Sequence, residues 1–337
     1  MNVLGIETSC DECSVAVVAD GRRILAHTVA SQIDIHLPYS GVVPELASRK
    51  HVEWIVPVYR SALREAGIGQ NDIDGVAVTN RPGLVGSLVV GVSFAKALAF
   101  GLDVALVGVD HILAHLYAPQ LEAPIEYPFL GLLVSGGHTI ICRMDSPFDM
   151  HVLGTTIDDA CGEAFDKVAK FFGWGYPGGV VIDRMAAAGD DRAYSFPDPS
   201  LHKGDHRYDV SYSGLKTAVI NQLDQFHNSG HAGTAENIAA SFQKAAIDMI
   251  VRRLLRASED QAINRVVVGG GVAANRYLRR TLGERDDLEV RFPSPLLCTD
   301  NAAMIAGLGF RLLQRGERDG LDLDVAARVS GFRRGYP

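Results

Sequence analysis

The sequence has few cysteines and no long run of apolar residues. Its five cysteines among 337 residues are too few and too scattered for a disulfide framework, so we expect a reducing compartment. The uncharged stretch at residues 83–95 contains three glycines and is too short to span a membrane. The first residues lack the basic segment of a signal peptide. These absences predict a soluble protein of the cytoplasm.

The sequence also lacks an excess of positive charge. Its 32 Lys and Arg residues against 40 Asp and Glu give a net charge of −8, so binding to nucleic acid would need a local basic patch or a partner. Arg276, Arg279 and Arg280 are a candidate patch, although they could equally be a solvated helix face. Neither a P-loop motif nor a Gly-x-Ser-x-Gly motif occurs, which excludes P-loop NTPases and the α/β-hydrolase nucleophile turn.

Glycine is abundant, with 35 residues, and 47% of the chain is hydrophobic, which is enough for a large core. The pattern of apolar segments repeats. Three short predicted strands occupy residues 2–29 and again residues 129–153. Each set is followed by a strand, a glycine turn and a helix, at residues 75–100 and 265–282. We therefore predict a duplicated α/β fold with a ligand cleft between two lobes, although any α/β protein contains strand–glycine–helix units.

The prolines around residues 119–128 suggest where the two lobes join. We predict a first lobe at residues 1–125 and a second, adenylate-binding lobe at residues 126–319. The tail at residues 320–337 is expected to return to the first lobe.

Two histidines, His111 and His115, lie four residues apart. On a helix this spacing puts both imidazoles on one face, close enough to bind one metal ion. The alternative is a pair that caps or lines a core helix. Ile112 occupies the place of the catalytic glutamate in zincin metalloproteases, so a peptidase would lack its general base. Asp300 precedes an apolar helical run and is either a third ligand or the N-cap of that helix.

Glycine turns follow predicted strands in the second half of the chain. Ser135–Gly137 and Gly269–Gly271 would let backbone N–H groups approach an anion such as a phosphate. The second turn also fits a dinucleotide-binding fingerprint. We discount that fit because the unit lies late in the chain and Glu289 stands before the end of its strand.

Carboxylates accompany a predicted helix over residues 157–172. Asp159, Glu163 and Asp166 share one of its faces, which is either a solvated acidic face or part of a ligand site. Asp183 follows a further glycine turn, where a carboxylate can bind ribose hydroxyls.

The segment Cys10–Cys13 follows the first predicted strand. It is a weak redox motif or zinc half-site because no second cysteine pair accompanies it. Its carboxylates, Asp11 and Glu12, would face the predicted cleft and could act as a base or as metal partners.

Eight segments of the sequence occur in the order found in one protein family. They are Gly5–Glu12, Gly41–Ser48, Leu133–His138, Asp158–Lys167, Tyr176–Gly179, Ser213–Thr217, Gly269–Asn275 and Cys298–Asn301. From residue 3 to about residue 307 the sequence resembles the bacterial TsaD (YgjD) family of tRNA N6-adenosine threonylcarbamoyltransferases. The resemblance implies a two-lobed actin/Hsp70/sugar-kinase-like (ASKHA) fold, in agreement with the predicted duplication.

The resemblance also implies a reaction. The threonylcarbamoyl group would move from threonylcarbamoyl-AMP to N6 of adenosine 37 in tRNAs that read ANN codons, releasing AMP. The N6 amine must lose a proton in this reaction, and our own hypothesis is that Asp11 or Glu12 is the catalytic acceptor. One divalent metal ion, Fe or Zn first and Mn also compatible, would bind His111, His115 and Asp300. The family's substrate-binding positions correspond here to Leu133, Val134, Ser135, Gly136, Gly137, Asp166, Gly179, Asp183 and Asn275.

The implied partners are tRNA, the ATPase TsaE, and TsaB, which would form a heterodimer through the first lobe. No membrane partner is implied. Two rival functions stay open, a sugar-kinase-like phosphotransferase and a non-catalytic nucleotide-binding scaffold. No sugar site supports the first, and the retained metal residues argue against the second.

The sequence departs from the family pattern at a few positions. Cys13 replaces a usual threonine, Arg81 lies in a turn that is usually Gly-Pro-Gly, and Asp110 replaces asparagine or histidine. Arg81 could alter the first glycine turn or add positive charge for tRNA.

Overall fold

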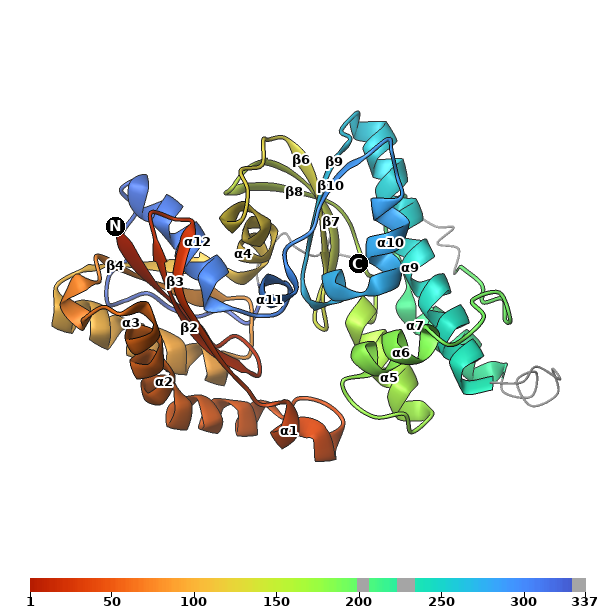
Figure 1. Ribbon diagram of the computed structural model, residues 1–337, viewed down its shortest axis with the longest axis horizontal. Helices are drawn as coiled ribbons and strands as arrows, with labels where there is room; N and C mark the ends of the chain where they lie inside the picture. The colour runs from red at the N-terminus through yellow and green to blue at the C-terminus, as the bar shows by residue number, and fades with distance from the viewer. Residues whose placement is uncertain (199–205, 223–233, 329–337) are drawn as a thin grey trace. The chain divides into compact units, whose positions relative to one another are not determined.

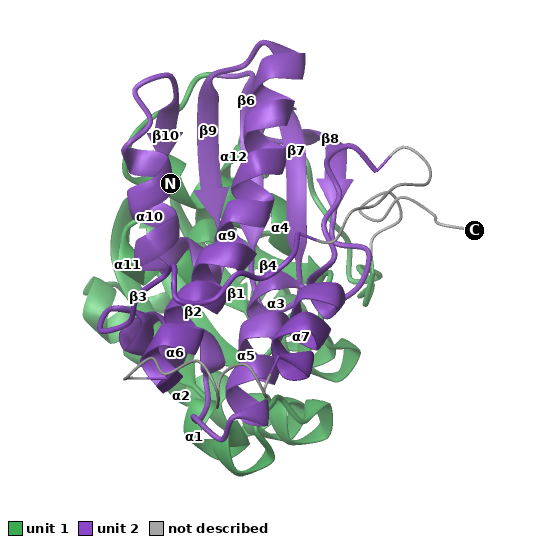
Figure 2. Cartoon of the chain, turned by 90° about the vertical axis from the view of Figure 1, so that its right-hand side faces the viewer, with its two compact units in different colours: residues 1–126, 293–331 green, residues 127–292, 332–337 purple. Residues whose placement is uncertain are grey.

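The computed structural model describes residues 1–198, 206–222 and 234–328 (Figure 1). These residues form two compact units, coloured separately in Figure 2. Unit 1 holds Met1–Glu126 and residues 293–328, and unit 2 holds the described part of Tyr127–Phe292. Each unit is built on one five-stranded sheet.

The sheet of unit 1 has the order β3-β2-β1-β4-β5. Its strands are β1 (Asn2–Glu7), β2 (Glu12–Ala19), β3 (Arg23–Ser31), β4 (Gly75–Arg81) and β5 (Ala105–Asp110). The first three form an antiparallel meander, β4 is parallel to β1, and β5 is parallel to β4. Buried apolar residues on both faces of β1 show that helices cover both sides of this sheet.

The sheet of unit 2 has the order β10-β9-β6-β7-β8. Its strands are β6 (Phe129–Val134), β7 (Thr139–Ser146), β8 (Asp149–Thr155), β9 (Arg265–Gly269) and β10 (Glu289–Arg291). Strands β6 to β8 form the meander, β9 is parallel to β6, and β10 is parallel to β9. With β6 in the place of β1 the two connectivities are identical, which confirms the predicted duplication.

Helices pack on opposite faces of the unit 1 sheet. The described helical segments of unit 1 are α1 (Ile33–His36), η1 (Leu37–Tyr39), α2 (Pro44–Ala66), η2 (Gln70–Asp72), α3 (Val85–Leu102), α4 (His111–Tyr117), η3 (Ala118–Leu121), α11 (Pro295–Cys298) and α12 (Ala302–Gln314). Leu4 and Ile6 of β1 join the core beneath α2 and α3, whereas Gly5, which points the other way, meets α12.

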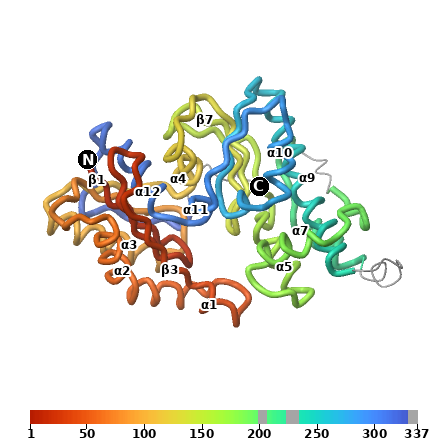
Figure 3. Tube along the Cα trace, in the orientation of Figure 1, coloured from red at the N-terminus to blue at the C-terminus, as the bar shows by residue number. Residues whose placement is uncertain are grey.

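Small residues let α12 lie directly on the sheet. A Cβ on Gly5 would stand 2.2 Å from the carbonyl oxygen of Ala302, and one on Gly309 would stand 2.3 Å from Cβ of Ala77. Figure 3 shows blue α12 beside red β1. This packing fixes the position of Asp300, two residues before the helix.

The division between the lobes differs from our prediction. Residues 293–319, expected in the second lobe, belong to unit 1 because α12 buries its apolar side chains on the first sheet. The tail follows at residues 320–328, where the Ala326 N–H donates to the Asn80 carbonyl at 3.0 Å. The remainder of the predicted tail, residues 329–337, lies outside the described residues. The predicted cleft between the lobes stays a prediction.

Helix α3 is, by length and composition alone, apolar enough to cross a membrane. It packs against β4 and α2, and its residues Val92, Ala95 and Ala99 are buried in the core of unit 1. This packing is that of a core helix in an α/β unit.

The described helices of unit 2 are α5 (Cys161–Phe171), α6 (Gly178–Ala186), α7 (Tyr212–Asn221), α9 (Thr234–Gln261), η4 (Gly271–Ala274) and α10 (Arg276–Gly283). Helix α5 begins four residues later than predicted. The Asp158 carboxylate instead accepts hydrogen bonds from the N–H groups of Tyr212 and Ser213, at 2.8 and 3.0 Å, and this holds the preceding residues in a turn.

Candidate functional site

The two predicted metal-binding histidines lie on α4, which starts where β5 ends. Asp110 is the N-cap of this helix, and its carboxylate accepts the N–H groups of Ile112 and Leu113 at 2.9 and 3.2 Å. The imidazoles of His111 and His115 lie one turn apart, with ring centroids separated by 4.5 Å. The predicted common face is therefore confirmed.

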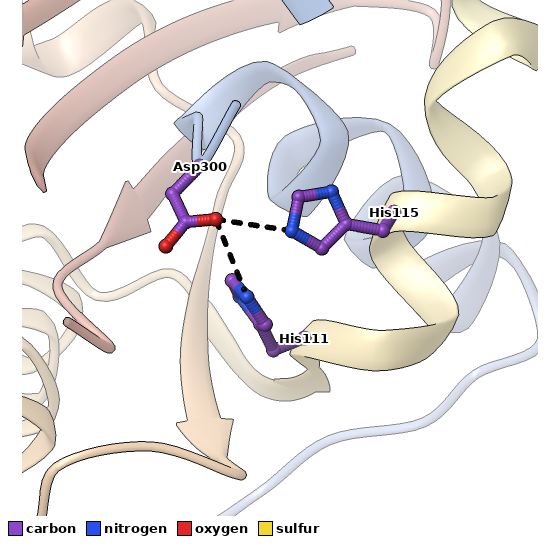
Figure 4. A group of neighbouring side chains, drawn as sticks. All are labelled: His111, His115 and Asp300. Carbon is purple, nitrogen blue, oxygen red and sulfur yellow. Dashed lines mark hydrogen bonds and ion pairs between the residues drawn. The ribbon is translucent and has the colours of Figure 1, made fainter. Parts of the chain in front are cut away.

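Asp300 points at both histidines (Figure 4). Its Oδ1 lies 3.1 Å from His115 Nε2 and 3.5 Å from His111 Nε2, and the candidate ligand atoms all lie within 4.8 Å of one another. The N-cap of α12 is Asn301, whose Oδ1 accepts the Met304 N–H at 3.0 Å. The alternative that Asp300 caps α12 is therefore wrong.

The donor set suits a divalent cation. Two imidazole nitrogens and one carboxylate are ligands for Zn, Fe or Mn, and they leave coordination positions for water or substrate. Burial opposes a charge on His111, but the carboxylates of Glu7 and Asp300 outweigh it and raise the pKa of His111 to about 9. Burial, and then the neighbouring His111, lower the pKa of His115. The carboxylates of Glu7 and Asp300 therefore favour positive charge at His111.

Glu7 is a buried carboxylate that the sequence reasoning missed. It is 0% exposed, and its Oε2 lies 2.9 Å from His111 Nδ1 and accepts the Thr79 hydroxyl at 2.6 Å. Burial alone would raise the pKa of Glu7, but the charge of His111 lowers it. The available signal was a glutamate that closes an otherwise apolar strand.

The two candidate catalytic carboxylates lie near the start of β2. Burial raises the pKa of Asp11, and burial raises the pKa of Glu12 to about 8. Glu12 Oε1 accepts the Ser31 hydroxyl at 2.9 Å, and its buried Oε2 has no hydrogen-bond partner within the described residues. All five cysteines are free, Cys10 and Cys13 among them.

The predicted substrate-binding turns of unit 2 abut each other. Leu133 and Val134 end β6, and the following turn is held by Ser135 Oγ, which accepts the N–H groups of Gly137 and His138 at 3.3 and 3.0 Å. Gly270 has φ +89°, and a Cβ there would stand 2.4 Å from the Val134 carbonyl oxygen. Cβ atoms on Gly136 and Gly137 would meet open space.

The remaining predicted substrate positions lie on three helical segments. Asp166 of α5 accepts the Gly178 N–H at 2.7 Å, and a Cβ on Gly179 would meet open space. Asn275 is the N-cap of α10 and donates to Gln243 Oε1 at 2.8 Å. Asp159 precedes α5, so it does not share a helix face with Glu163, although Lys167 contacts both carboxylates, at 2.7 and 2.9 Å.

A cavity of about 380 Å³ lies in unit 2. Its polar lining includes Asp183, Asp191, Gln243, Arg276, Tyr277 and Arg280. Of the nine predicted substrate positions, Asp183 alone lines it.

The arginines of α10 are engaged with neighbouring groups in unit 2. Arg276 Nε donates to Asp183 Oδ2 at 2.7 Å, Arg279 Nε donates to the Ala273 carbonyl, and Arg280 lies over the Tyr277 ring. A role of these arginines as a patch for nucleic acid stays a prediction.

Two of the departures from the family pattern contact each other. Arg81 Nε lies 3.5 Å from Asp110 Oδ2, and Asp110 is buried whereas Arg81 is half-exposed. The Arg81 side chain is thus directed at the carboxylate that caps α4.

A sequence model described as TsaD, tRNA N6-adenosine threonylcarbamoyltransferase, matches residues 23–307. The chain belongs to the TsaD family. Curated TsaD relatives named tRNA N6-adenosine threonylcarbamoyltransferase match it over nearly their full length. The protein of Treponema denticola is 58% identical over 332 residues and covers 98% of each chain. That of Borreliella burgdorferi is 48% identical over 336 residues, which are 100% of this chain and 96% of the relative.

Solved structures resemble this TsaD chain in fold. Full-length HypF, in its phosphate- and nucleotide-bound form, superposes with a TM-score of 0.63 at 16% identity, over 93% of this chain and 46% of HypF. Component A of the (R)-2-hydroxyglutaryl-CoA dehydratase of Acidaminococcus fermentans gives 0.55 at 14% identity, over 92% of this chain and 98% of that one. Together with the family match, these neighbours confirm the predicted ASKHA fold.

Proposed function

We propose that this TsaD-family chain transfers the threonylcarbamoyl group from threonylcarbamoyl-AMP to N6 of adenosine 37 in tRNAs that read ANN codons. The observation that carries the proposal is the His111, His115 and Asp300 group, whose candidate ligand atoms lie within 4.8 Å of one another in a family member. A non-catalytic scaffold would have no need of this group, and a sugar kinase would need a sugar site that nothing in the sequence supplies.

The reaction is an acyl transfer. The N6 amine attacks the carbamoyl carbon, the bond from that carbon to the phosphate oxygen breaks, AMP leaves, and the amine proton passes to a base. A divalent ion on His111, His115 and Asp300 would polarise the carbonyl of the donor. Zn and Fe are both compatible with this donor set.

The base is proposed among the carboxylates at the start of β2. With a pKa of about 8, part of the Glu12 population is ionised near neutral pH, and that ionised carboxylate is more basic than an ordinary glutamate and can accept a proton. Asp11 is the alternative, since its pKa is also raised by burial. Unchanged turnover in Glu12→Gln would move the role to Asp11.

Unit 2 is proposed to hold the adenylate. A carboxylate such as Asp183 can accept hydrogen bonds from ribose hydroxyls, and it lines a cavity of about 380 Å³. The open space beside Gly136, Gly137 and Gly179 would let the donor approach the backbone there. Asp166 and Asn275 brace the neighbouring segments through Gly178 and Gln243.

We further propose that a TsaB subunit docks on unit 1 and that TsaE and tRNA join the complex in the cytoplasm. Val52 of α2 is 63% exposed, and Val85 and Val89 of α3 are 50% and 45% exposed. The two helices touch near these valines, because a Cβ on Gly86 would stand 3.1 Å from Ser48 Cβ. Exposed valines on adjoining helices suit an apolar partner helix.

The test is nucleoside mass spectrometry on an ANN-reading tRNA. The mixture contains threonylcarbamoyl-AMP, ATP, TsaB and TsaE with wild type or His111→Ala, and exposed His151→Ala is the matched control. We expect threonylcarbamoyladenosine from wild type and His151→Ala, and at least ~1000-fold less from His111→Ala. Leaving out TsaB or TsaE should each lower the yield.

The possible outcomes distinguish a catalytic metal group, a structural metal group and a non-catalytic scaffold. Equal product from His111→Ala would make the metal group structural. No product from wild type, under conditions in which a known homologue is active, would favour the scaffold.

A further inference from the structure

Three neighbouring strands of unit 1 bring a group of buried polar side chains together at their carboxyl ends. Glu7 ends β1, Thr79 lies near the end of the adjacent β4, and His111 follows β5, the next strand of the sheet. Strands β1, β4 and β5 are parallel, so these ends meet at one edge. The side chains are therefore placed by the sheet itself and not by a loop.

Glu7 makes contacts with both of its oxygens. Oε1 accepts the Ser9 N–H at 2.5 Å, whereas Oε2 accepts the Thr79 hydroxyl at 2.6 Å and lies 2.9 Å from His111 Nδ1. A carboxylate accepts hydrogen bonds and donates none when ionised, so the proton of the His111–Glu7 bond sits on Nδ1. The lone pair of a neutral His111 is then on Nε2, the nitrogen 3.5 Å from Asp300 Oδ1.

The second histidine lacks such support. His115 Nε2 lies 3.1 Å from Asp300, but its buried Nδ1 has no hydrogen-bond partner among the described side chains and backbone. The two imidazoles of the candidate metal group thus differ in how strongly their orientation and tautomer are fixed.

We propose that Glu7 is a positioning residue of the metal centre, which fixes the tautomer and ring orientation of His111 and is itself held by Thr79. The inference rests on the metal group of the proposed function. Partners of this kind raise the basicity of a ligating histidine, and their removal typically weakens metal binding 10- to 100-fold. His111 is then the pre-oriented ligand, and His115 adjusts to the ion.

The experiment measures Zn²⁺ affinity of the full chain by competition with a chromophoric chelator. The variants are Glu7→Gln, Thr79→Val and His111→Ala. Glu65→Gln is the matched control, because Glu65 also accepts a threonine hydroxyl in unit 1, that of Thr28. We expect Glu7→Gln to weaken Zn²⁺ binding about 10- to 100-fold and Glu65→Gln to leave it unchanged.

Thr79→Val keeps the side-chain shape and leaves Glu7 in place. If Glu7→Gln fails to fold, this variant still tests whether the Thr79–Glu7 contact supports metal binding. It should weaken Zn²⁺ binding by a smaller factor, about 2- to 5-fold. Imidazole ¹⁵N NMR of the metal-free protein supplies a readout that a merely structural role would not move. The spectra are recorded above the His111 pKa of about 9, where the ring is neutral. In wild type His111 should then carry its proton on Nδ1, and in Glu7→Gln the two tautomers should mix.

Two results would overturn the inference in distinguishable ways. Zn²⁺ affinity within twofold of wild type in both Glu7→Gln and Thr79→Val, together with lost binding in His111→Ala, would remove Glu7 and leave the metal group intact. Zn²⁺ affinity that is unchanged in His111→Ala would remove the metal group itself, and the positioning role with it.

Discussion

The strands β1 and β6 hold the same place in two sheets of identical connectivity, yet their ends differ in chemistry. Both strands are buried. In each unit a glycine from another turn of the same unit lies against the backbone at or just after the end of the strand. In unit 1 a Cβ on Gly83 would stand 2.7 Å from the Ser9 carbonyl oxygen, and in unit 2 one on Gly270 would stand 2.4 Å from that of Val134. The backbone arrangement has been kept in both units.

What differs is the residues at the strand end. β1 closes with Glu7, which meets an imidazole, whereas β6 closes with Val134 and continues into Ser135–Gly137, which carries no ionisable group. One scaffold thus presents charged side chains that suit a cation, and the other presents a glycine turn that suits an anion. The duplicated backbone fixes where a ligand binds, and a few residues at the strand ends decide which ligand it is.

The largest effect on stability should come from adding a side chain to Gly270, where two turns of unit 2 meet. Gly270→Ala adds a Cβ that meets the Val134 carbonyl and forces a side chain onto φ +89°. We expect the free energy of unfolding of unit 2 to fall by about 2–4 kcal/mol. Urea unfolding followed by Trp174 fluorescence, in a Trp54→Phe background, measures this unit.

Matched variants sharpen that result. Gly271→Ala places a Cβ in open space and should change stability by less than about 0.5 kcal/mol. Gly83→Ala in unit 1 meets a carbonyl without a positive φ, so its loss should be intermediate. Equal losses in Gly270→Ala and Gly271→Ala would contradict the close approach of the two turns.

Much of the fold could be predicted from the sequence because short-range patterns carry it. Apolar runs, glycine turns and the two meanders indicate both sheets. The sequence predicts a return of the chain to unit 1 at residue 320 but not its actual start at residue 293, since that start depends on Gly5 and Gly309 letting α12 lie on strands far away in the sequence. Such long-range shape complementarity leaves no periodic signal.

The candidate metal site could likewise be predicted only in part from the sequence. The spacing of His111 and His115 is visible in the sequence, but Asp300 stands next to Asn301, and either residue can cap a helix. Only the structure shows that Asn301 is the cap. Glu7 lies 72 residues from Thr79 and 104 from His111, so nothing local marks it as a partner of either.

The second-largest effect concerns Glu12, a buried acid after β1 that has no counterpart in the Ser135–Gly137 turn after β6. Burial raises the pKa of Glu12 from 4.5 to about 8. Between these values the unfolded chain ionises while the folded chain stays protonated, so this group makes the free energy of unfolding fall as pH rises from 4.5 to 8. Glu12→Gln should remove that slope and gain at least about 1 kcal/mol relative to wild type between pH 5 and pH 8.

Urea unfolding at several pH values, followed by Trp54 fluorescence in a Trp174→Phe background, measures the slope. Ser31→Ala makes the complementary test. The Ser31 hydroxyl donates to Glu12 and lowers its pKa, so its removal should extend the slope to higher pH. Parallel curves for wild type and Glu12→Gln would show that Glu12 is ionised in the folded protein.

The smallest effect belongs to the turn that departs from the family pattern. Arg81 is 51% exposed and its Nε lies 3.5 Å from Asp110 Oδ2, so solvent screens the ion pair. A double-mutant cycle of Arg81→Ala with Asp110→Asn should give a coupling free energy of about 0.5 kcal/mol. This coupling should decrease with added NaCl. Asp110→Asn keeps an oxygen that can accept the N–H groups of Ile112 and Leu113, so α4 and its histidines should stay in place. If Arg81 instead serves tRNA, Arg81→Ala will weaken tRNA binding equally with aspartate or asparagine at position 110. If its task is to neutralise Asp110, tRNA affinity will not change, and the loss will appear only as stability.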